Sequence, residues 1–290
     1  MLYLVDASVY IFRAYFSLPD SIRDPHGNPV QAVYGFTRFL AELLARERPR
    51  YIACAFDESL TSSFRNRLYP PYKANRALPP RELERQLKAC RRAARALGIA
   101  TFASRRYEAD DLIGSLAARH ANRRRPAVIV SRDKDLAQLI GDGDIFWDYA
   151  ADERHDVASI TRKLGVPPAR IPDLLGLAGD AVDNIPGVAG IGAKTAAALL
   201  ATFGSFDALY ANLDRVASLN LRGARSIAER LATGRGQAML SRELATIHRD
   251  IPLKTTLADL RWARVNTRAA NRFFNELGFG ATLRRQVECL

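Results

Sequence analysis

The first half of the chain alternates short apolar runs with segments whose apolar residues recur at helical spacing. Five runs have the length and composition of buried strands: LYLVDAS, YIACAFD, GIATFAS, PAVIVSRD and DIFWDYA. Between them lie QAVYGFTRFLAELLARE, a helix opened by PPRELERQLKACRRAARAL, and a third helix that begins near YEADDL and runs to about His120. Strands that alternate with helices predict an α/β fold with a central, mostly parallel sheet.

Residues 58–80 and the second half of the chain depart from this alternation. SLTSSFRNRLYPPYKANRALPP is rich in Arg, Tyr and Pro and has no clean period, and long connections of this kind are often functional. Beyond about residue 165 the strands stop, and helices joined by short Gly or Pro turns follow. We therefore expect an α/β core at residues 1–165 and a helical region at residues 166–290 that docks on the sheet.

The chain is strongly basic, with 43 Lys and Arg residues against 31 Asp and Glu and a formal net charge of +12. This balance favours a polyanionic partner, with nucleic acid the first candidate and an acidic membrane surface the second. No apolar run approaches the ~20 residues that cross a bilayer, and the N-terminus MLYLVDASVY lacks the basic start of a secretory signal. We therefore expect a cytoplasmic protein, and of the two candidate partners we expect nucleic acid and no membrane.

The cysteines and histidines argue against two common kinds of site. The cysteines are few, odd in number and widely spaced, so they indicate neither a disulfide framework nor a thiolate metal site. The histidines lack the spacing of zinc ligands. We expect any metal in this protein to be held by oxygen. The residues concerned are Cys54, Cys90, Cys289, His26, His120, His155 and His248.

The segment YEADDL places three carboxylates within four positions of this basic chain. Glu108 and Asp111 share a face of the first turn of the predicted helix, and Asp110 lies nearby. Like charges at this spacing repel, so the cluster costs free energy unless a cation lies among them. Taken alone, a solvated helix face is the more common explanation of such a cluster.

Further carboxylates follow the predicted strands at their C-terminal ends, where ligand sites in open parallel sheets lie. A single Asp after a strand is usually a turn residue or a helix cap, but several converging carboxylates raise one another's pKa values and destabilise a fold. Mg²⁺ or Mn²⁺ resolves this conflict, and two such ions ~3.5–4 Å apart commonly serve displacement at phosphorus. These carboxylates are Asp6, Asp57, Asp133 and Asp135.

The most specific stretch is GDAVDNIPGVAGIGAKTAAALL at residues 179–200. Three glycines allow positive φ and close approach of the backbone, and the helix that follows presents free N–H groups and a lysine in its first turn. This hairpin is typical of a sequence-independent clamp for nucleic-acid phosphates. The alternatives are an ordinary interhelical turn and a nucleotide-binding loop, although neither nucleotide-loop motif is present. The residues are Gly187, Gly190, Gly192 and Lys194, and two further candidate metal ligands, Asp180 and Asp183, precede them.

Seven motifs together resemble the 5′-nuclease superfamily: VDAS, PVQAVYGF, AFD, YKANR, EADDL, SRDKDL and GDAVDNIPGVAGIG. This superfamily comprises flap endonucleases, the 5′–3′ exonuclease domain of bacterial DNA polymerase I and stand-alone relatives of that domain. The motifs follow the family order over nearly the whole chain. The resemblance implies a PIN-like α/β nuclease core, a helical arch or clamp at about 58–100, and a helix–three-turn–helix motif at about 173–205.

The resemblance also implies roles for individual residues. Lys73 and Arg76 of YKANR match basic catalytic positions, and Tyr72 would stack on or orient the substrate. One metal cluster would be built mainly from Asp6, Asp57, Glu108, Asp110 and Asp111. A second ion would be supported, partly through water, by Asp133, Asp135, Asp180 and Asp183. A K⁺ ion in the hairpin would be held by the main-chain carbonyls of Leu177, Ala178, Pro186, Val188 and Ile191.

The expected activity is metal-dependent hydrolysis of phosphodiesters near DNA 5′ ends, by a 5′–3′ exonuclease or 5′-flap endonuclease that leaves a 5′-phosphate and a 3′-hydroxyl. We expect flapped, nicked or branched DNA as the substrate, with RNA primer ends as a further candidate. The protein is expected to be a monomer whose coupling to any polymerase occurs in trans. Two rivals stay open: a DNA-structure-binding protein with little or no catalysis, and a ribonuclease of a related acidic-site α/β fold.

Overall fold

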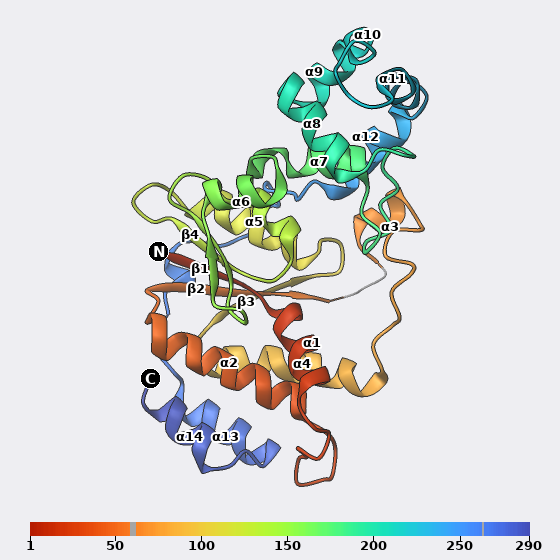
Figure 1. Ribbon diagram of the computed structural model, residues 1–290. Helices are drawn as coiled ribbons and strands as arrows, with labels where there is room; N and C mark the ends of the chain where they lie inside the picture. The colour runs from red at the N-terminus through yellow and green to blue at the C-terminus, as the bar shows by residue number, and fades with distance from the viewer. Residues whose placement is uncertain (59–61, 263) are drawn as a thin grey trace.

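The centre of the protein is one mostly parallel sheet (Figure 1). The computed structural model describes residues 1–58, 62–262 and 264–290, and within them six strands follow the order β3-β2-β1-β4-β5-β6. Neighbouring strands pair in parallel except for β6, which runs antiparallel to β5. The strands are β1 Leu2–Asp6, β2 Tyr51–Asp57, β3 Ala100–Ser104, β4 Ala127–Val130, β5 Ile145–Asp148 and β6 Glu153–His155.

The five strands that the hydrophobic pattern predicts are all present, so the predicted α/β architecture is confirmed. The pattern does not predict β6, because its residues are polar and mostly exposed and no apolar run marks it. It pairs only at the edge of the sheet, against β5. A buried face produces the apolar pattern from which a strand is predicted. An edge strand of this kind needs no buried face and therefore leaves no such pattern.

Side chains of the central strands alternate between two hydrophobic cores, one on each face of the sheet. Leu2 and Leu4 of β1 point to the face covered by α5, whereas Tyr3 and Val5 point to the face covered by α1, α2 and α4. Because helices bury both faces, the strands are continuous apolar runs instead of alternating ones. The bounds are α1 Ala7–Ser17, α2 Gln31–Glu47, α4 Arg81–Ala96 and α5 Ala109–His120.

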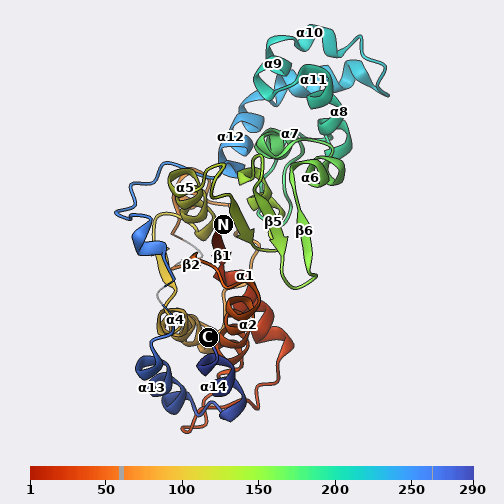
Figure 2. The ribbon, with the colours of Figure 1, turned by 90° about the vertical axis from the view of Figure 1, so that its left-hand side faces the viewer.

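The helical second half divides into a lobe beside the sheet and a return segment, as Figure 2 shows from the side. The return runs past the sheet, where the Trp262 N–H donates to the Arg50 carbonyl at 3.0 Å, and α13 and α14 then pack against α4 and α2. No helix of the described ranges is long and apolar enough to cross a membrane. Before this half come the 3₁₀ helix Lys134–Leu139 and α6 Val157–Leu164. The helices of the second half are α7 Ile171–Ala178, α8 Ala193–Phe203, α9 Phe206–Ala211, α10 Leu213–Val216, α11 Ala224–Thr233, α12 Arg235–Ala245, α13 Thr267–Leu277 and α14 Ala281–Glu288, with 3₁₀ helices at Pro168–Arg170 and Ala258–Leu260.

The connection predicted at residues 58–80 links the sheet to α4 by way of the helical lobe (Figure 1). It contains the short helix α3 (Phe64–Leu68) and then residues 69–80, which we call the strap. Residues 59–61 of this connection lie outside the described residues. The helix that follows, α4, packs on α2. The strap is therefore the part of the predicted arch that spans the space between the lobe and the sheet.

Candidate active site

Five carboxylates line one cavity of about 390 Å³ at the carboxyl edge of the sheet. Parallel pairing of β1 with β2 and with β4 brings the C-terminal ends of these strands together, so the acids that follow them converge. The N-cap residue and the first turn of α5 add one acid each, and the strap adds two cations. The carboxylates are Asp6, Asp57, Glu108, Asp110 and Asp133, and the cations are Lys73 and Arg76.

Burial and crowding raise the pKa values of Asp6 and Asp110. Burial and the neighbouring charges of Asp57 and Asp133 raise the pKa of Asp6 to about 7. Burial, followed by the charges of Asp133 and Asp6, also raises the pKa of Asp110 well above its usual value. Ionised carboxylates in this cavity therefore cost free energy unless a cation lies among them, and a divalent ion with a preference for oxygen ligands meets that condition.

Hydrogen bonds hold two of the carboxylates in place. The Ser8 hydroxyl donates to Asp57 Oδ2 at 2.7 Å, and the Ala109 N–H donates to Asp57 Oδ1 at 2.8 Å. The Ser131 hydroxyl donates to Asp6 Oδ2 at 2.8 Å. Sequence reasoning missed both serines, because a serine just after a strand looks the same whether it orients a ligand or caps a turn.

Three more carboxylates continue the acidic cluster from Asp133 toward the helical lobe: Asp135, Asp180 and Asp183. Burial and then the charges of Asp133 and Asp180 raise the pKa of Asp135 to about 8. Burial, and to a lesser degree the charge of Asp183, likewise raises the pKa of Asp133. Within the described ranges, Asp135 Oδ1 is shielded from solvent and has no hydrogen-bond partner. A buried carboxylate oxygen without a donor is suited to a cation, so this donor set fits a hard divalent ion.

The strap places two cations among the carboxylates. Lys73 Nζ lies 2.7 Å from Glu108 Oε2 and 3.6 Å from Asp183 Oδ2, and the Arg76 guanidinium pairs with Asp183 Oδ1. Burial opposes the ionisation of Glu108, but the charges of Lys73 and Arg65 outweigh it and lower the pKa of Glu108. Glu108 is therefore ionised within the crowded cavity and holds Lys73 at its edge.

Hydrogen bonds also tie the strap to the loop that precedes the glycine hairpin. The Lys73 N–H donates to the Asp183 carbonyl at 2.9 Å, and Asn184 Nδ2 donates to the Pro71 carbonyl at 2.7 Å. Lys73 has a φ of 55°, in the left-handed region that a lysine seldom adopts. The loop contact therefore stabilises an unusual backbone conformation, and the position of the Lys73 ammonium depends on the helical lobe.

Asp111 does not line the cavity, which corrects its prediction as a metal ligand. Its carboxylate accepts hydrogen bonds from Arg65 Nη1 at 2.7 Å and Nη2 at 2.8 Å. The N–H groups of Glu108 and His248 also donate to it, at 3.0 and 2.9 Å. The side chain is fully buried and its lone pairs are occupied. One helical step turns Asp111 ~100° away from Asp110. The two residues are adjacent in the sequence, but Asp110 lines the cavity and Asp111 pairs with Arg65.

Tyr72 is buried, so its ring is not available for base stacking in this structure, and its hydroxyl contacts fit the orienting role that the resemblance implies. Only 3% of its surface is exposed, and its hydroxyl lies 3.2 Å from Glu108 Oε2 and 3.1 Å from Asp183 Oδ2. Burial raises the pKa of the Tyr72 hydroxyl, so the group stays protonated and donates to the carboxylates. The ring would have to leave the core before it could stack on a base.

The three glycines of the hairpin differ in whether their φ angle and surroundings require a residue without a side chain. Gly187 has a φ of 63°, and a Cβ there would lie 2.3 Å from the Gly179 nitrogen. Gly190 has a φ of 76°. Gly192 has a φ of −90° and open space around its Cβ position, so the predicted positive φ is wrong for this residue. Two of the three glycines are therefore required by the backbone itself.

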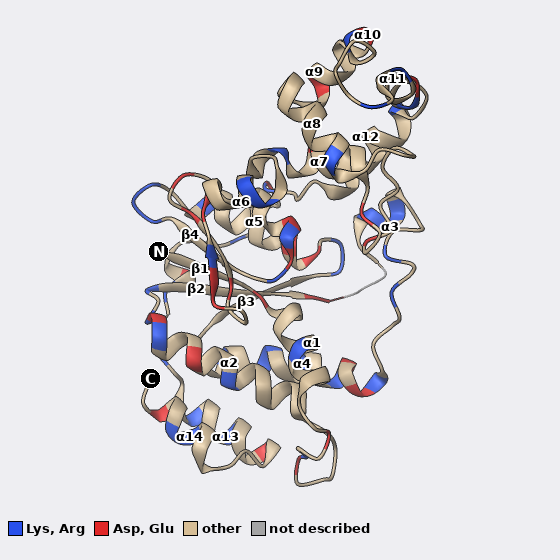
Figure 3. Ribbon diagram, viewed as in Figure 1, with Lys and Arg blue, Asp and Glu red and all other residues tan. Residues whose placement is uncertain are grey.

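The hairpin lies among basic side chains on the lobe side of the cavity. Lys194 is exposed in the first turn of α8, and Arg230 of α11 donates to the Gly190 carbonyl at 3.4 Å. Figure 3 shows further basic positions on α3, α6 and α11. Arg230 was not predicted, because it lies forty residues away in the sequence and no local motif marks it.

The carbonyls nominated for K⁺ converge where α7 meets the hairpin. The Leu177 carbonyl accepts from the Val188 N–H at 2.8 Å, and the Val188 carbonyl accepts from the Ile191 N–H at 3.0 Å. A carbonyl with one hydrogen bond keeps a second lone pair, so these contacts leave room for a cation. K⁺ binding stays a prediction for Leu177, Ala178, Pro186, Val188 and Ile191.

A Gly187→Ala variant is expected to lower stability by at least about 1–2 kcal/mol, because alanine at positive φ is strained and its Cβ meets backbone atoms. Thermal unfolding measures this, and binding to a short DNA duplex is expected to weaken in parallel. Gly192→Ala is the matched control in the same hairpin, since its Cβ meets nothing within 4 Å. Equal melting temperatures for the two variants would contradict the hairpin geometry.

Two family models divide the chain between them. The 5′–3′ exonuclease N-terminal resolvase-like domain matches residues 1–165, and the 5′–3′ exonuclease C-terminal SAM fold matches residues 166–268. Among solved structures, T5 5′-exonuclease with divalent zinc ions bound aligns with a TM-score of 0.67 at 20% identity, over 94% of this chain and 96% of that one. A T5 flap endonuclease complex with DNA and metal ions aligns with a TM-score of 0.64 at 22% identity, over 99% of both chains.

Sequence relatives extend the comparison to bacterial polymerases. DNA polymerase I of Bacillus caldotenax is 38% identical over 288 residues, which is 98% of this chain and 32% of the relative. DNA polymerase I of Pseudomonas aeruginosa is 39% identical over 279 residues, which is 96% of this chain and 30% of the relative. The chain thus spans about a third of the length of these relatives. By its two matched domains, the chain belongs to the 5′–3′ exonuclease family.

Proposed function

We propose that this protein hydrolyses DNA phosphodiesters near 5′ ends, as a structure-specific 5′–3′ exonuclease and 5′-flap endonuclease. The observation that supports this most is the single cavity lined by Asp6, Asp57, Asp110 and Asp133, with Lys73 at its edge. The products would carry a 5′-phosphate and a 3′-hydroxyl. Flapped, nicked and branched duplexes are the proposed substrates, and RNA primer ends are a further candidate.

The carboxylates would hold two divalent ions, Mg²⁺ or Mn²⁺. The buried, unpartnered Asp135 Oδ1 and the raised pKa of Asp6 both support a cation at this edge of the sheet. When bound, such ions supply Lewis-acid stabilisation of the charge that develops at phosphorus. One ion would be held by Asp6, Asp57, Glu108, Asp110 and Asp133, and the second would be supported by Asp133, Asp135, Asp180 and Asp183.

The protein's own side chains position and neutralise the substrate. Lys73 and Arg76 would neutralise charge on the phosphoryl oxygens once a phosphate replaces the carboxylates that they now contact. The Tyr72 hydroxyl would keep Glu108 oriented while Lys73 moves. Ser8 would hold the Asp57 carboxylate in its ligand geometry. These roles need no movement of the sheet.

The two halves of the chain would have different functions, catalysis and DNA binding. Residues 1–165 would carry the nuclease core, with the arch or clamp at about 58–100. Residues 166–290 would carry the DNA-binding region, with the helix–three-turn–helix motif at about 173–205. In that motif the Gly187 and Gly190 turn and Lys194 would hold duplex phosphates, with K⁺ at the nominated carbonyls.

Cleavage of a 5′-flapped duplex in Mg²⁺ tests this function. Wild-type protein is expected to release the flap in Mg²⁺ and not in EDTA, and Lys73→Ala is expected to lower kcat by about 10²–10³-fold, because a transition-state charge contact is lost. Product sizes from 5′-labelled flapped, nicked and blunt duplexes report the reaction. Lys254→Ala removes an exposed lysine and is the matched control.

The same assay separates the rival functions. Tight binding of flapped DNA without cleavage in Mg²⁺ or Mn²⁺ would favour a DNA-structure-binding protein over an enzyme. Cleavage of single-stranded RNA that survives deletion of the residues 187–192 turn would favour a ribonuclease. The proposed function instead requires that this deletion abolish tight duplex binding.

A further inference from the structure

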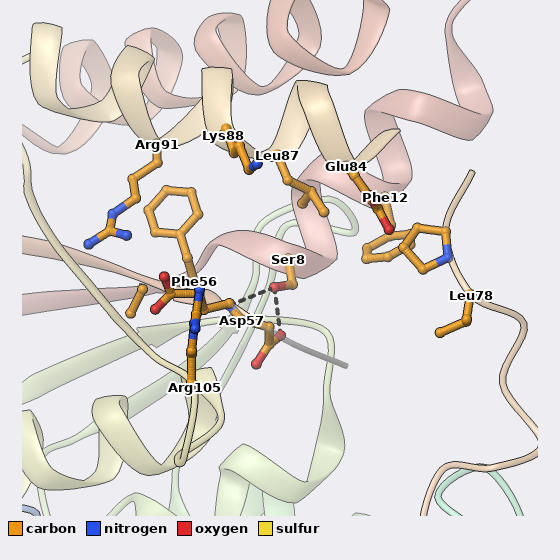
Figure 4. Close-up of a pocket in the computed structure, with 13 residues that line it drawn as sticks. Ser8, Phe12, Phe56, Asp57, Leu78, Glu84, Leu87, Lys88, Arg91 and Arg105 are labelled. Carbon is orange, nitrogen blue, oxygen red and sulfur yellow. Dashed lines mark hydrogen bonds between the residues drawn. The ribbon is translucent and has the colours of Figure 1, made fainter. Parts of the chain in front are cut away.

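A second cavity, of about 480 Å³, adjoins the proposed active site between α4 and the carboxyl ends of β2 and β3 (Figure 4). Four residues line both cavities, so the two share a wall: Ser8, Phe12, Asp57 and Leu78. The proposed mechanism makes no use of this second space. Its volume lies in the range of ~300–1,000 Å³ that small-molecule sites occupy, which is enough for one nucleotide.

Three cations line the second cavity: Lys88 and Arg91 from α4, and Arg105 after β3. Within residues 1–58, 62–262 and 264–290, Arg91 Nε is shielded from solvent and has no hydrogen-bond partner. An unpaired guanidinium N–H costs free energy, and a small shift of the Arg91 side chain, which lines the cavity, would bring it to an acceptor there. Figure 4 shows Arg91 and Arg105 approaching the Phe56–Asp57 end of β2 from opposite sides.

These cations differ from those of the active site in their pairing. Lys73 and Arg76 form ion pairs with Glu108 and Asp183, whereas none of the three cations of the second cavity pairs with a carboxylate of the described chain. Two exposed carboxylates, Glu58 and Glu84, also line this space and limit its affinity for anions. A weak anion site of this kind favours release of the bound group after a reaction.

The remaining wall is apolar and suits a base. Phe12, Leu78, Pro79 and Leu87 line the cavity beside the cations. An aromatic and aliphatic wall next to guanidinium groups matches a nucleotide, which presents a flat base and a charged phosphate on one small molecule. Inorganic phosphate would use the cations alone and would leave this wall exposed.

The position of the cavity relates it to the path of a DNA strand. The glycine hairpin lies in the helical lobe, and α4 lies on the other face of the sheet from α5 (Figure 1). The active-site cavity is lined by residues at the carboxyl edge of the sheet, between these two parts. The hairpin would hold the duplex part of the DNA, and the carboxylates would hold the scissile phosphate. From there the strand would continue toward α4. Its 5′-terminal nucleotide would enter the second cavity.

We propose that the second cavity binds the 5′-terminal nucleotide of the substrate, with Arg91, Lys88 and Arg105 contacting its 5′-phosphate. The site would select phosphorylated 5′ ends for removal of single nucleotides. This inference rests on the proposed function, because it concerns the same strand in the same reaction.

The test compares duplexes with recessed or blunt 5′ ends that carry either a 5′-phosphate or a 5′-hydroxyl. Wild-type protein is expected to show a kcat/KM for release of the terminal nucleotide that is about 10-fold higher with the phosphate, the ratio that one charge-assisted contact supplies. Arg91→Ala is expected to reduce this ratio to about 1–2, and Arg91→Lys to restore part of it. Arg85→Ala on the same helix, whose side chain does not line the cavity, is expected to keep the wild-type ratio.

A binding measurement keeps the inference independent of catalysis and of folding defects in one variant. Thymidine 5′-monophosphate, titrated in EDTA and followed by NMR, is expected to shift signals of α4 residues, and thymidine is not. The exposed Lys88→Ala variant is expected to weaken this binding. A wild-type phosphate ratio near 1, or an unchanged ratio in Arg91→Ala, would overturn the site while leaving the nuclease activity standing. Absence of cleavage together with specific monophosphate binding would instead overturn the proposed function alone.

Discussion

An Asp110→Asn variant is expected to lose at least about 10²–10³-fold in kcat on a 5′-flapped duplex while its affinity for the duplex stays near that of wild type. Asp110 lines the cavity, and its raised pKa reflects burial and the charges of Asp133 and Asp6. Asparagine keeps the shape of the side chain but removes one oxygen ligand and one negative charge. Single-turnover cleavage and an equilibrium binding assay in Ca²⁺ measure the two effects separately.

The exposed acid Asp142 supplies a matched control, and Asp142→Asn is expected to cut and bind as wild type does. If Asp110→Asn cleaved the flapped duplex as fast as wild-type protein, the assignment of the carboxylate cavity as the catalytic centre would be wrong. A loss of binding as large as the loss of cleavage would show that Asp110 supports the fold or the DNA contact instead of the chemistry.

The raised pKa values also predict how stability depends on pH in metal-free buffer. Asp6, with a pKa of about 7, and Asp135, with a pKa of about 8, hold more protons in the folded state than in the unfolded state above about pH 4. Their contribution to the free energy of unfolding therefore falls as pH rises through this window. Thermal unfolding in EDTA is expected to show a lower melting temperature at pH 8 than at pH 5, and Mg²⁺ is expected to raise it most at pH 8.

The sequence predicts the parts of this protein that depend on local pattern. Continuous apolar runs mark the central strands, because both faces of the sheet are buried. The convergence of Asp6, Asp57 and Asp133 also follows, since parallel strands end at one edge and the connections between them are regular. A site assembled from strand ends is therefore visible before the fold is known.

The parts that escape prediction depend on contacts between distant segments. Asp110 and Asp111 look equivalent in YEADDL, and only the partner Arg65, 46 positions away, separates a cavity residue from a buried ion pair. Tyr72 lies in a segment without period, so nothing local reveals that it is buried. The cations Arg91 and Arg105 come from a helix and a strand end with no shared motif. Sequence patterns report which face of an element is buried, but not which partner covers it.

Replacement of Arg65 by methionine is expected to destabilise the fold by about 3–5 kcal/mol, because it leaves the buried Asp111 carboxylate without its cation. Arg65 is 2% exposed and forms two hydrogen bonds with Asp111. Its Nε and Nη2 also donate to the Leu244 and Thr246 carbonyls, both at 2.8 Å, so it joins the connection ahead of the strap to α5 and to the C-terminal end of α12. Urea unfolding of Arg65→Met measures the loss of free energy.

The neighbouring Arg67 lies on the same short helix but is exposed, so Arg67→Met is the matched control and is expected to change stability by less than about 0.5 kcal/mol. The double variant Arg65→Met/Asp111→Leu is expected to recover part of the loss, because it removes the unpaired charge as well as its partner. If Arg65→Met were as stable as wild-type protein, Asp111 would not depend on the ion pair with Arg65 and would again be a candidate metal ligand. The separation of Asp110 from Asp111 would then have no energetic basis, and YEADDL would supply three metal ligands instead of two.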